Sequence, residues 1–355
     1  MSPAIPKDST VLVTGINGYI GSHVADQLLK AGYRVRGTTR DASKMKNLLD
    51  LWEEQYGKIR VEVAVVPNMA DDGAFDEAVK GVTGIVHVAS NLSFSPNPND
   101  VRPHSLHLQY TSNVGTFIQV IPECLAGVNG LLKSAASEPS VKRFVITSSS
   151  MAATSPKPNK EFYIDENTWN DEDVEAAHAP PPYEPSRTWA VYGSSKVESE
   201  RAVWNFVKEK NPGFVVNSVL PDTNMGLILD PGQGSTGGLV RKLFLGDNSG
   251  LKNLPPQYFI DVQDTARLHV SALIDEDVKN ERLFAFAEPF NNNMLLRIFR
   301  KLRPDAKIMD DFHDDSVNDL SKVANQRAAE LLKRDFGRAG FTSLEESLAN
   351  NIQGL

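Results

Sequence analysis

The chain has 355 residues, of which 41% are hydrophobic and 23% charged, and its formal net charge is −8. This length suits one large domain or a large domain with a smaller lobe, and the composition is that of a water-soluble globular protein. The negative charge argues against nucleic acid or a membrane surface as the main partner.

The single cysteine, Cys124, excludes an intramolecular disulfide and a metal site built from several cysteines. Ile121 and Leu125 lie beside it on a predicted helix, so we expect Cys124 to pack in a core. The N-terminal residues show neither the basic region nor the apolar run of a secretory signal, and no stretch has the apolar length of a membrane span. We therefore expect a cytoplasmic protein.

Apolar, β-branched runs alternate with helical patterns in the first part of the chain. Residues 10–14 predict a buried parallel strand that stops at glycine. In the helix that follows, Ile20, Val24 and Leu28 share one face, and Gly32 ends it. Further strands are predicted at 33–37, 60–66, 84–89 and 143–147, and further helices at 43–56, 73–79 and 121–136. This alternation predicts an α/β fold with a Rossmann-type doubly wound parallel sheet.

The alternation breaks at residues 155–187, a proline-rich and acidic stretch that predicts a long surface excursion. The later elements are predicted as a helix opening near Tyr192, a strand at 214–220, a short helix at 239–245, a strand at 258–262 and a helix at 264–273. We expect the NAD(P)-binding domain to comprise residues 8–222 and 258–275, and a smaller C-terminal substrate-binding lobe to comprise residues 223–257 and 276–355.

Three glycines at a spacing of three follow the first strand: Gly15, Gly18 and Gly21. Gly15 permits a tight turn, Gly18 lets the backbone approach a pyrophosphate, and Gly21 allows close contact between helix and strand. The helix start adds N–H donors for phosphate. Because a strand and a helix flank the glycines, the pattern predicts dinucleotide binding. The residues between the glycines that we expect at the cofactor are Asn17, Tyr19 and Ile20.

The end of the second strand bears on the choice of cofactor. An NAD-binding protein offers Asp or Glu there for the ribose hydroxyls, whereas a nearby arginine accommodates a 2′-phosphate. This chain has Arg40 at that point, with Lys44 close behind. An exposed basic turn is the simpler alternative. The pattern favours NADPH (NADP+) as the cofactor.

Tyr192 and Lys196 are four residues apart on a predicted helix, so they lie one above the other on one face. A cation beside a phenol favours the phenolate, which suits the tyrosine for proton transfer near neutral pH. Serine hydroxyls at 148–150 follow the strand at 143–147. At the carboxyl end of a parallel strand, such a hydroxyl faces the cofactor crevice and can polarise a carbonyl.

With these residues the sequence resembles the extended short-chain dehydrogenases/reductases over most of its length. The resemblance is carried by TGINGYIG, HVAS at 87–90, RFVITSSSMAAT at 143–154, IDENTW at 164–169, YGSSK and LPDTNMG at 220–226. Within that family the chain is most similar to the dihydroflavonol-reductase-like branch, in particular the fungal NADPH-dependent aldehyde and carbonyl reductases.

The resemblance implies that Ser149 orients the carbonyl, that Tyr192 donates the proton, and that Lys196 assists Tyr192 and binds the ribose. It also implies cofactor contacts for Val88, Ala89, Ser90, Pro221 and Ser235. The family usually places an acid and an apolar residue after the third strand, against the adenine. Here Asn68 and Met69 stand in that place, and the asparagine carbonyl can still accept from the adenine amino group.

We therefore expect NADPH-dependent reduction of an aldehyde or ketone, with a small carbonyl substrate as the partner and no metal, in a monomer or homodimer. The alternatives are an alcohol or hydroxysteroid dehydrogenase, a nucleotide-sugar epimerase, and a non-catalytic NADPH-sensing protein. Retention of the serine, tyrosine and lysine together argues against the sensor. As walls of the substrate pocket we expect Phe94, Leu254 and Gln257.

Residues 101–119 interrupt the family pattern. They form either a lineage-specific surface loop or the translation of a retained intron, because the valine at the start, the glutamine at the end and Ser112-Asn113 are compatible with intron signals. An intron-derived segment should pack poorly beside the active site. His104 and His107 lack a companion acid or cysteine and make a poor metal site.

Overall fold

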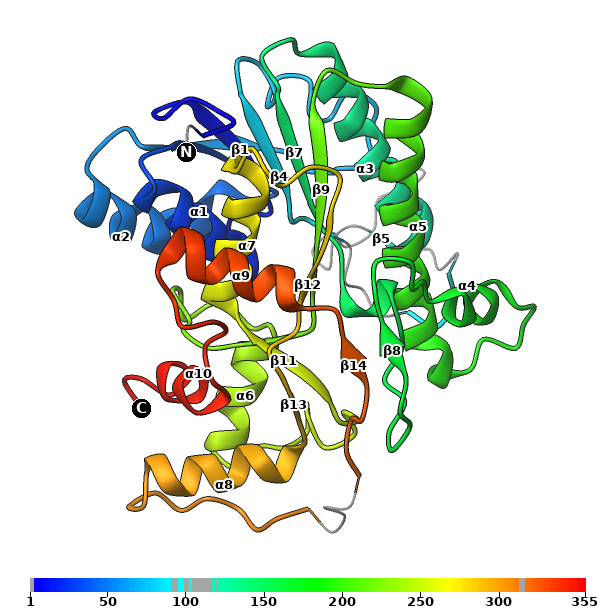
Figure 1. The fold of residues 1–355 in the computed structure, drawn as a ribbon, viewed down its shortest axis with the longest axis vertical. Helices are drawn as coiled ribbons and strands as arrows, with labels where there is room; N and C mark the ends of the chain where they lie inside the picture. The colour runs from blue at the N-terminus through cyan, green and yellow to red at the C-terminus, as the bar shows by residue number, and fades with distance from the viewer. Residues whose placement is uncertain (1–2, 91–94, 99–101, 104–116, 119, 313–316) are drawn as a thin grey trace.

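The computed structural model describes residues 3–90, 95–98, 102–103, 117–118, 120–312 and 317–355. Its centre is a seven-stranded sheet in the order β12-β9-β7-β4-β1-β2-β3, with every neighbouring pair parallel (Figure 1). The strands are β1 (Thr10–Thr14), β2 (Arg34–Thr39), β3 (Val61–Val65), β4 (Gly84–His87), β7 (Arg143–Thr147), β9 (Val215–Pro221) and β12 (Arg282–Ala285). The predicted Rossmann-type fold is confirmed.

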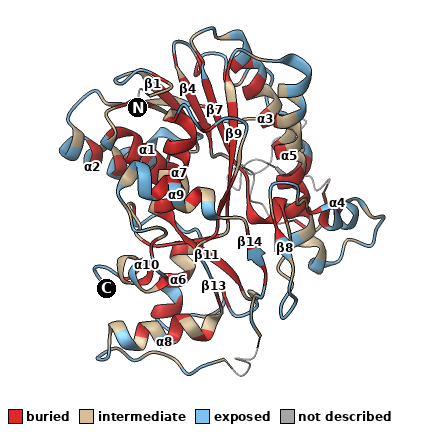
Figure 2. Cartoon of the chain, viewed as in Figure 1, coloured by how far each residue is buried: buried red, intermediate tan, exposed pale blue. Residues whose placement is uncertain are grey.

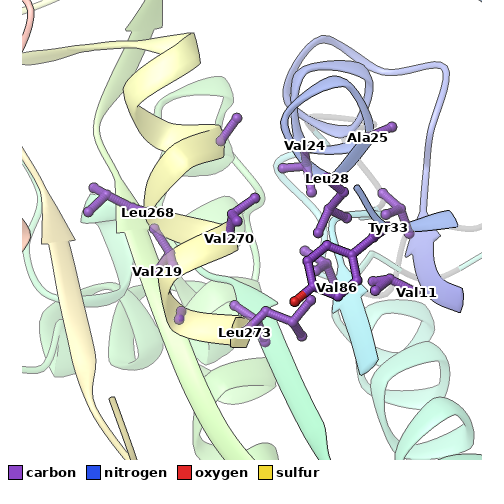
Figure 3. Packing of buried hydrophobic residues seen from close by; sticks show 14 of the residues in the cluster. Val11, Val24, Ala25, Leu28, Tyr33, Val86, Val219, Leu268, Val270 and Leu273 are labelled. Atoms are coloured by element: carbon purple, nitrogen blue, oxygen red, sulfur yellow. The ribbon is translucent and has the colours of Figure 1, made fainter. Parts of the chain in front are cut away.

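Helices cover both faces of this sheet, and the central strands are buried along their length (Figure 2). The helices α1 (Tyr19–Lys30) and α7 (Val262–Ile274) pack together on one face, where Leu28 and Leu273 meet Val11 and Val86 (Figure 3). The helices α3 (Val120–Ser137) and α5 (Thr188–Lys210) pack together on the other face. The helix α2 (Lys46–Tyr56) follows β2, and its Leu48 and Trp52 belong to the same hydrophobic cluster as Leu28 and Leu273. None of the helices in the described part has the length and apolar character that crossing a membrane requires.

A second, three-stranded sheet forms the smaller lobe, in the order β10-β11-β13. Its strands are β10 (Thr223–Met225), β11 (Gln257–Asp261) and β13 (Glu288–Phe290), and its helices are α6 (Thr236–Phe244), α8 (Asn292–Leu302) and α10 (Leu344–Asn351). Buried residues of these elements, Phe259 and Phe299 among them, make a separate core cluster.

The pairing of the strands differs from the predicted division of the chain at two places. β11 was expected in the large domain, but it pairs with β10 and β13. Conversely, β12 was assigned to the small lobe, but it pairs with β9 and forms one edge of the central sheet. The helix α9 (Gln326–Phe336) contacts α7 and β12. The sequence of an apolar strand does not indicate which of the two sheets it joins, because the strand is buried in either sheet.

The predicted helix at 73–79 is wrong, because this segment is a succession of turns. Gly73 and Gly81 both adopt positive φ, +70° in each case, and break the backbone on either side. The glycines favour such turns, because glycine adopts positive φ without steric cost.

The excursion at residues 155–187 lies against the long helix α5. It contains β8 (Tyr163–Ile164), which pairs with β14 (Lys322–Val323), and α4 (Asp171–His178), which packs on α5. The short 3₁₀ helices of the chain are η1 (Ala42–Met45), η2 (Ser150–Ala152) and η3 (Pro185–Arg187). Of the insertion at 101–119, only the antiparallel pair β5 (Arg102–Pro103) and β6 (Phe117–Ile118) is described. Both interpretations of that insertion, as well as His104 and His107, therefore stay predictions that fall largely outside the described residues.

Candidate active site

The glycine turn between β1 and α1 has the geometry that a dinucleotide requires. Gly15 has a φ of +67°, and a Cβ there would stand 3.1 Å from the backbone of Ala89. A Cβ on Gly21 would overlap the carbonyl of Gly15, so the helix can approach the strand only with glycine at this point. Gly18 begins α1, and the N–H groups of the first turn, at Tyr19, Ile20 and Gly21, have no acceptor within the helix. These N–H groups are available to a phosphate.

Thr14, which precedes the glycine turn, forms hydrogen bonds with residues at the end of β4. Its hydroxyl oxygen accepts from the backbone N–H groups of Val88 and Ala89, each at 3.0 Å. Its hydrogen must then go to Nδ1 of His87, 2.8 Å away, which leaves the other ring nitrogen protonated in the neutral ring. Burial, and then the charge of Lys196, lowers the pKa of His87 to about 3. His87 therefore stays neutral beside the lysine.

Arg40 and Lys44 lie at the end of β2, and both side chains are exposed. In the described part of the chain neither forms an ion pair, whereas the nearby Lys46 binds Asp50 at 2.6 Å. The one acid at this turn, Asp41, accepts from the backbone N–H and the hydroxyl of Ser43 and thereby begins η1. The turn thus offers cations and no carboxylate directed at a ribose, which fits a 2′-phosphate.

Ser149, Tyr192 and Lys196 meet where β7 ends beside α5. The hydroxyl of Tyr192 donates to the hydroxyl oxygen of Ser149 at 3.4 Å. The ammonium of Lys196 lies 5.9 Å from the centre of the Tyr192 ring, and its side chain is buried. Ser149 also accepts from the N–H of Met151 at 3.2 Å, which begins η2 and fixes the serine. The fold therefore brings the three predicted catalytic residues together.

A pocket beside these residues joins several of the predicted cofactor positions. Its lining comes from the segment after β3, from the ends of β4 and β7, from α3 and from α5. The residues are Met69, His87, Ala89, Ser90, Cys124, Ile146, Thr147, Ser148, Lys196 and Ser199. Cys124 is buried and lies 3.8 Å from the Ser90 hydroxyl. Strands far apart in sequence thus deliver their carboxyl ends to one place, as the predicted topology requires.

Asn68 and Met69, which are predicted to contact the adenine, follow β3. The amide of Asn68 donates to Asp71, and its carbonyl accepts from the N–H of Ala70 at 3.1 Å. One lone pair of that carbonyl is left for an adenine. Met69 packs beside Gly127 of α3, where a Cβ would stand 3.0 Å from its side chain.

The remaining predicted residues are distributed over the mouth of the crevice and the small lobe. Pro221 is buried at the end of β9, and Ser235 is exposed at the start of α6. Leu254 packs against the small-lobe core, and the buried Gln257 donates to the carbonyl of Pro255 at 3.2 Å. Phe94 falls outside the described residues. The assignment of these residues to cofactor or substrate stays a prediction.

Comparison with known proteins identifies the family. Residues 11–283 match the NAD dependent epimerase/dehydratase family. The chain belongs to this family. Aldehyde reductase 2 of Sporidiobolus salmonicolor is 41% identical over 352 residues, which cover 98% of this chain and 96% of that protein. Ketoreductase adrE of Penicillium rubens is 40% identical over 355 residues, which cover 98% of this chain and 97% of that protein.

Among solved structures, that of the yeast methylglyoxal/isovaleraldehyde reductase Gre2 complexed with NADPH superimposes with a TM-score of 0.76. Its sequence is 24% identical, and the match covers 96% of each chain. The likeness confirms the fold. The predicted resemblance to extended short-chain dehydrogenases/reductases, with fungal aldehyde and ketone reductases among the relatives, is confirmed as well.

Two further residues near the three predicted catalytic residues were not identified from the sequence. Trp189 is 51% exposed, and its ring meets that of Tyr192 edge-on at 6.2 Å. Asp222, directly after Pro221, accepts from the N–H of Thr223 at 2.8 Å and from the hydroxyl of Ser150. Burial raises the pKa of Asp222 to about 7. The position of Asp222 behind a strand end was the signal that could have identified it.

The phenol of Tyr19, in the glycine turn, contacts the small lobe. The side chain of Tyr19 is buried and donates to the carbonyl of Gly226 at 3.0 Å, and its ring lies against Gly237. Gln233 binds the same turn from the small lobe through the hydroxyl of Ser22 at 2.8 Å. Only the backbone N–H of Tyr19 is therefore placed to bind a phosphate, while its phenol holds the small lobe against the turn.

Proposed function

We propose that the protein reduces an aldehyde or a ketone to the alcohol with NADPH. The observation that carries the proposal is the contact between Tyr192 and Ser149 at 3.4 Å, with Lys196 beside the tyrosine ring. Two hydroxyls that meet at the carboxyl ends of parallel strands suit a carbonyl oxygen. The relatives named aldehyde reductase 2 and ketoreductase support the same reaction.

The residues that follow β2 support NADPH over NADH as the cofactor. Arg40 and Lys44 are exposed, and the nearest carboxylate, that of Asp41, is engaged by Ser43. The phosphate of the cofactor backbone fits the N–H groups that begin α1, because Gly15 and Gly21 leave no room for side chains there. The structure of the relative Gre2 with NADPH agrees with this choice.

The residues of the chain divide the work of the reaction. When bound, NADPH supplies the hydride that the carbonyl carbon receives. The Ser149 hydroxyl donates to the carbonyl oxygen and stabilises the negative charge that develops there. Tyr192 donates its phenolic proton to that oxygen, and Lys196 stabilises the phenolate that remains. Val88, Ala89, Ser90, Pro221 and Ser235 are proposed to line the cofactor, with Phe94, Leu254 and Gln257 as candidate walls for the substrate.

The test is cofactor consumption with a panel of aldehydes, ketones and keto esters. We expect the protein to oxidise NADPH with at least one carbonyl class, and kcat/KM with NADH to be lower by about one to two orders of magnitude, as the loss of a phosphate contact implies. Tight binding of NADPH without turnover of any carbonyl would instead identify a cofactor sensor. Equal kcat/KM for the two cofactors would contradict the assigned role of Arg40 and Lys44.

A further inference from the structure

A fully buried carboxylate, that of Glu200, lies one helical turn beyond Lys196 on α5. It accepts hydrogen bonds from several elements at once. The donors are the hydroxyl of Ser148 at 2.8 Å, the hydroxyl of Ser218 at 2.7 Å, the indole N–H of Trp204 at 3.2 Å, and the guanidinium of Arg282 at 2.8 and 3.3 Å. One side chain on the catalytic helix thus binds the end of β7, the strand β9 and the strand β12.

Arg282 neutralises this carboxylate and extends the connection to the surface excursion. Its side chain is 6% exposed, so the ion pair with Glu200 is buried. The same guanidinium donates to the carbonyls of Glu166 at 2.9 Å and Thr168 at 2.8 Å, and it stacks on the ring of Trp169 at 3.9 Å. A buried ion pair is weak evidence for added stability, since an apolar pair of similar volume often stabilises as well. Its directional bonds, in contrast, fix the positions of the groups that share it.

Among the donors to Glu200, Ser148 is directly bonded to Ser149, the residue proposed to bind the carbonyl oxygen. The backbone N–H of Ser148 donates to the carbonyl of Val219 at 2.8 Å, which holds this residue against β9. Ser149 is extended, with φ −159° and ψ 158°. The hydroxyl of Ser148 is directed at Glu200 and the hydroxyl of Ser149 at Tyr192, and both of these partners lie on α5.

We propose that Glu200 is a positioning residue for carbonyl reduction. Glu200 lies on α5, as do Tyr192 and Lys196. By accepting a hydrogen bond from Ser148, Glu200 fixes the direction of the Ser149 hydroxyl relative to Tyr192 and Lys196. This inference rests on the proposed function, since it assigns Ser149 to the carbonyl. Under this proposal Glu200 does not touch the substrate. Its replacement changes kcat and leaves the Kd for NADPH unchanged.

Ser148 and Ser218 provide a matched pair of variants. Both hydroxyls are buried and donate to the same carboxylate at nearly equal distance, but only Ser148 adjoins Ser149. The proposal predicts that Ser148→Ala lowers kcat by about tenfold, because a small displacement of a reacting group is costly. We expect Ser218→Ala to keep kcat near the wild-type value. Both variants should bind NADPH with unchanged Kd and lose a similar amount of thermal stability.

The decisive measurement is a double-mutant cycle of Ser148→Ala and Ser149→Ala on kcat. If Ser148 acts through Ser149, its replacement has no further effect once Ser149 is alanine. Equal losses in both backgrounds, no loss in Ser148→Ala, or an equal loss in Ser218→Ala would each overturn the proposal. A normal kcat in Ser149→Ala would overturn it too, and would at the same time show that the proposed role of Ser149 in the reaction is wrong.

Glu200→Gln tests the carboxylate directly. The amide keeps the volume and one acceptor oxygen but leaves the charge of Arg282 uncompensated. We expect kcat to fall at least as far as in Ser148→Ala, with NADPH still bound, and the melting temperature to fall further than in either serine variant. A folded Glu200→Gln protein with wild-type kcat would contradict the proposal. Should this variant not fold, the serine cycle still decides the question.

Discussion

The hydroxyls of Tyr192 and Ser149 lie 3.4 Å apart, although 43 positions separate the two residues in the chain. β7 delivers the serine and α5 delivers the tyrosine. Because Ser149 accepts both from Tyr192 and from the N–H of Met151, its own hydrogen can be donated to a substrate oxygen. No hydrogen bond among the described residues uses that hydrogen. The serine can therefore donate to a substrate carbonyl, and the tyrosine becomes the second donor when its hydrogen turns from Ser149 to that oxygen.

The exposed cations after β2 predict a selective effect on cofactor affinity. Replacing both Arg40 and Lys44 by alanine should raise KM for NADPH by about 10- to 100-fold and leave KM for NADH nearly unchanged, because only NADPH carries the 2′-phosphate. Lys46→Ala is the control, since that lysine already pairs with Asp50. Steady-state kinetics with both cofactors measure the effect. A parallel rise in KM for NADH would show that these cations do not read the phosphate.

Gly193 follows Tyr192 on α5, at a point where α4 packs closely against that helix. A Cβ there would overlap the carboxylate of Asp173, which is held by Asn170 at 2.7 Å and Ser155 at 2.8 Å. Asn170 also donates to the carbonyl of Met151 in η2 at 2.9 Å. Gly193→Ala should therefore displace α4 from α5, lower kcat and destabilise the fold by about 1–3 kcal/mol, a cost typical of overpacking.

Gly130 supplies the matched control for that variant. It also lies inside a helix, α3, but a Cβ there would meet open space. Gly130→Ala should stabilise the protein by about 0.5–1 kcal/mol, because alanine is the better helix former. Chemical unfolding and activity assays on both variants give the comparison. If both glycines tolerate alanine equally, α4 does not pack against α5 as closely as described.

Much of the fold and of the site could be predicted from the sequence, because local patterns determine both. The glycine turn is recognisable from its flanking strand and helix, and Tyr192 and Lys196 share a helical face by spacing alone. The contact of Asp173 with Gly193 and the pair of Glu200 with Arg282 were not predicted. Both join residues that no periodicity relates, so only the folded chain shows them.

His269 predicts an effect of pH on stability. It is fully buried, Nδ1 donates to the carbonyl of Thr265 at 2.8 Å, and Nε2 accepts from the hydroxyl of Thr147 at 2.7 Å. Burial lowers its pKa to about 4 from 6.5. The unfolded chain therefore takes up a proton before the folded chain does, and stability is lost as pH falls below about 6.5.

The variant His269→Gln isolates this contribution. It should be less stable than wild type at pH 7, because its amide does not reproduce both hydrogen bonds. Between pH 7 and pH 5 it should lose about 2 kcal/mol less than wild type, because it has no imidazole to protonate. Denaturant unfolding at both pH values provides the numbers. Identical losses in the two proteins would show that His269 is not held neutral by burial.

The most direct test of the proton-donor role is Tyr192→Phe, assayed for NADPH binding and for carbonyl reduction in the same preparation. The phenyl ring keeps the packing against Trp189 but has no proton to donate. We predict that kcat falls by about 10²- to 10⁴-fold while the Kd for NADPH stays near the wild-type value. An unchanged kcat in this variant would contradict the assignment of Tyr192 as the proton donor.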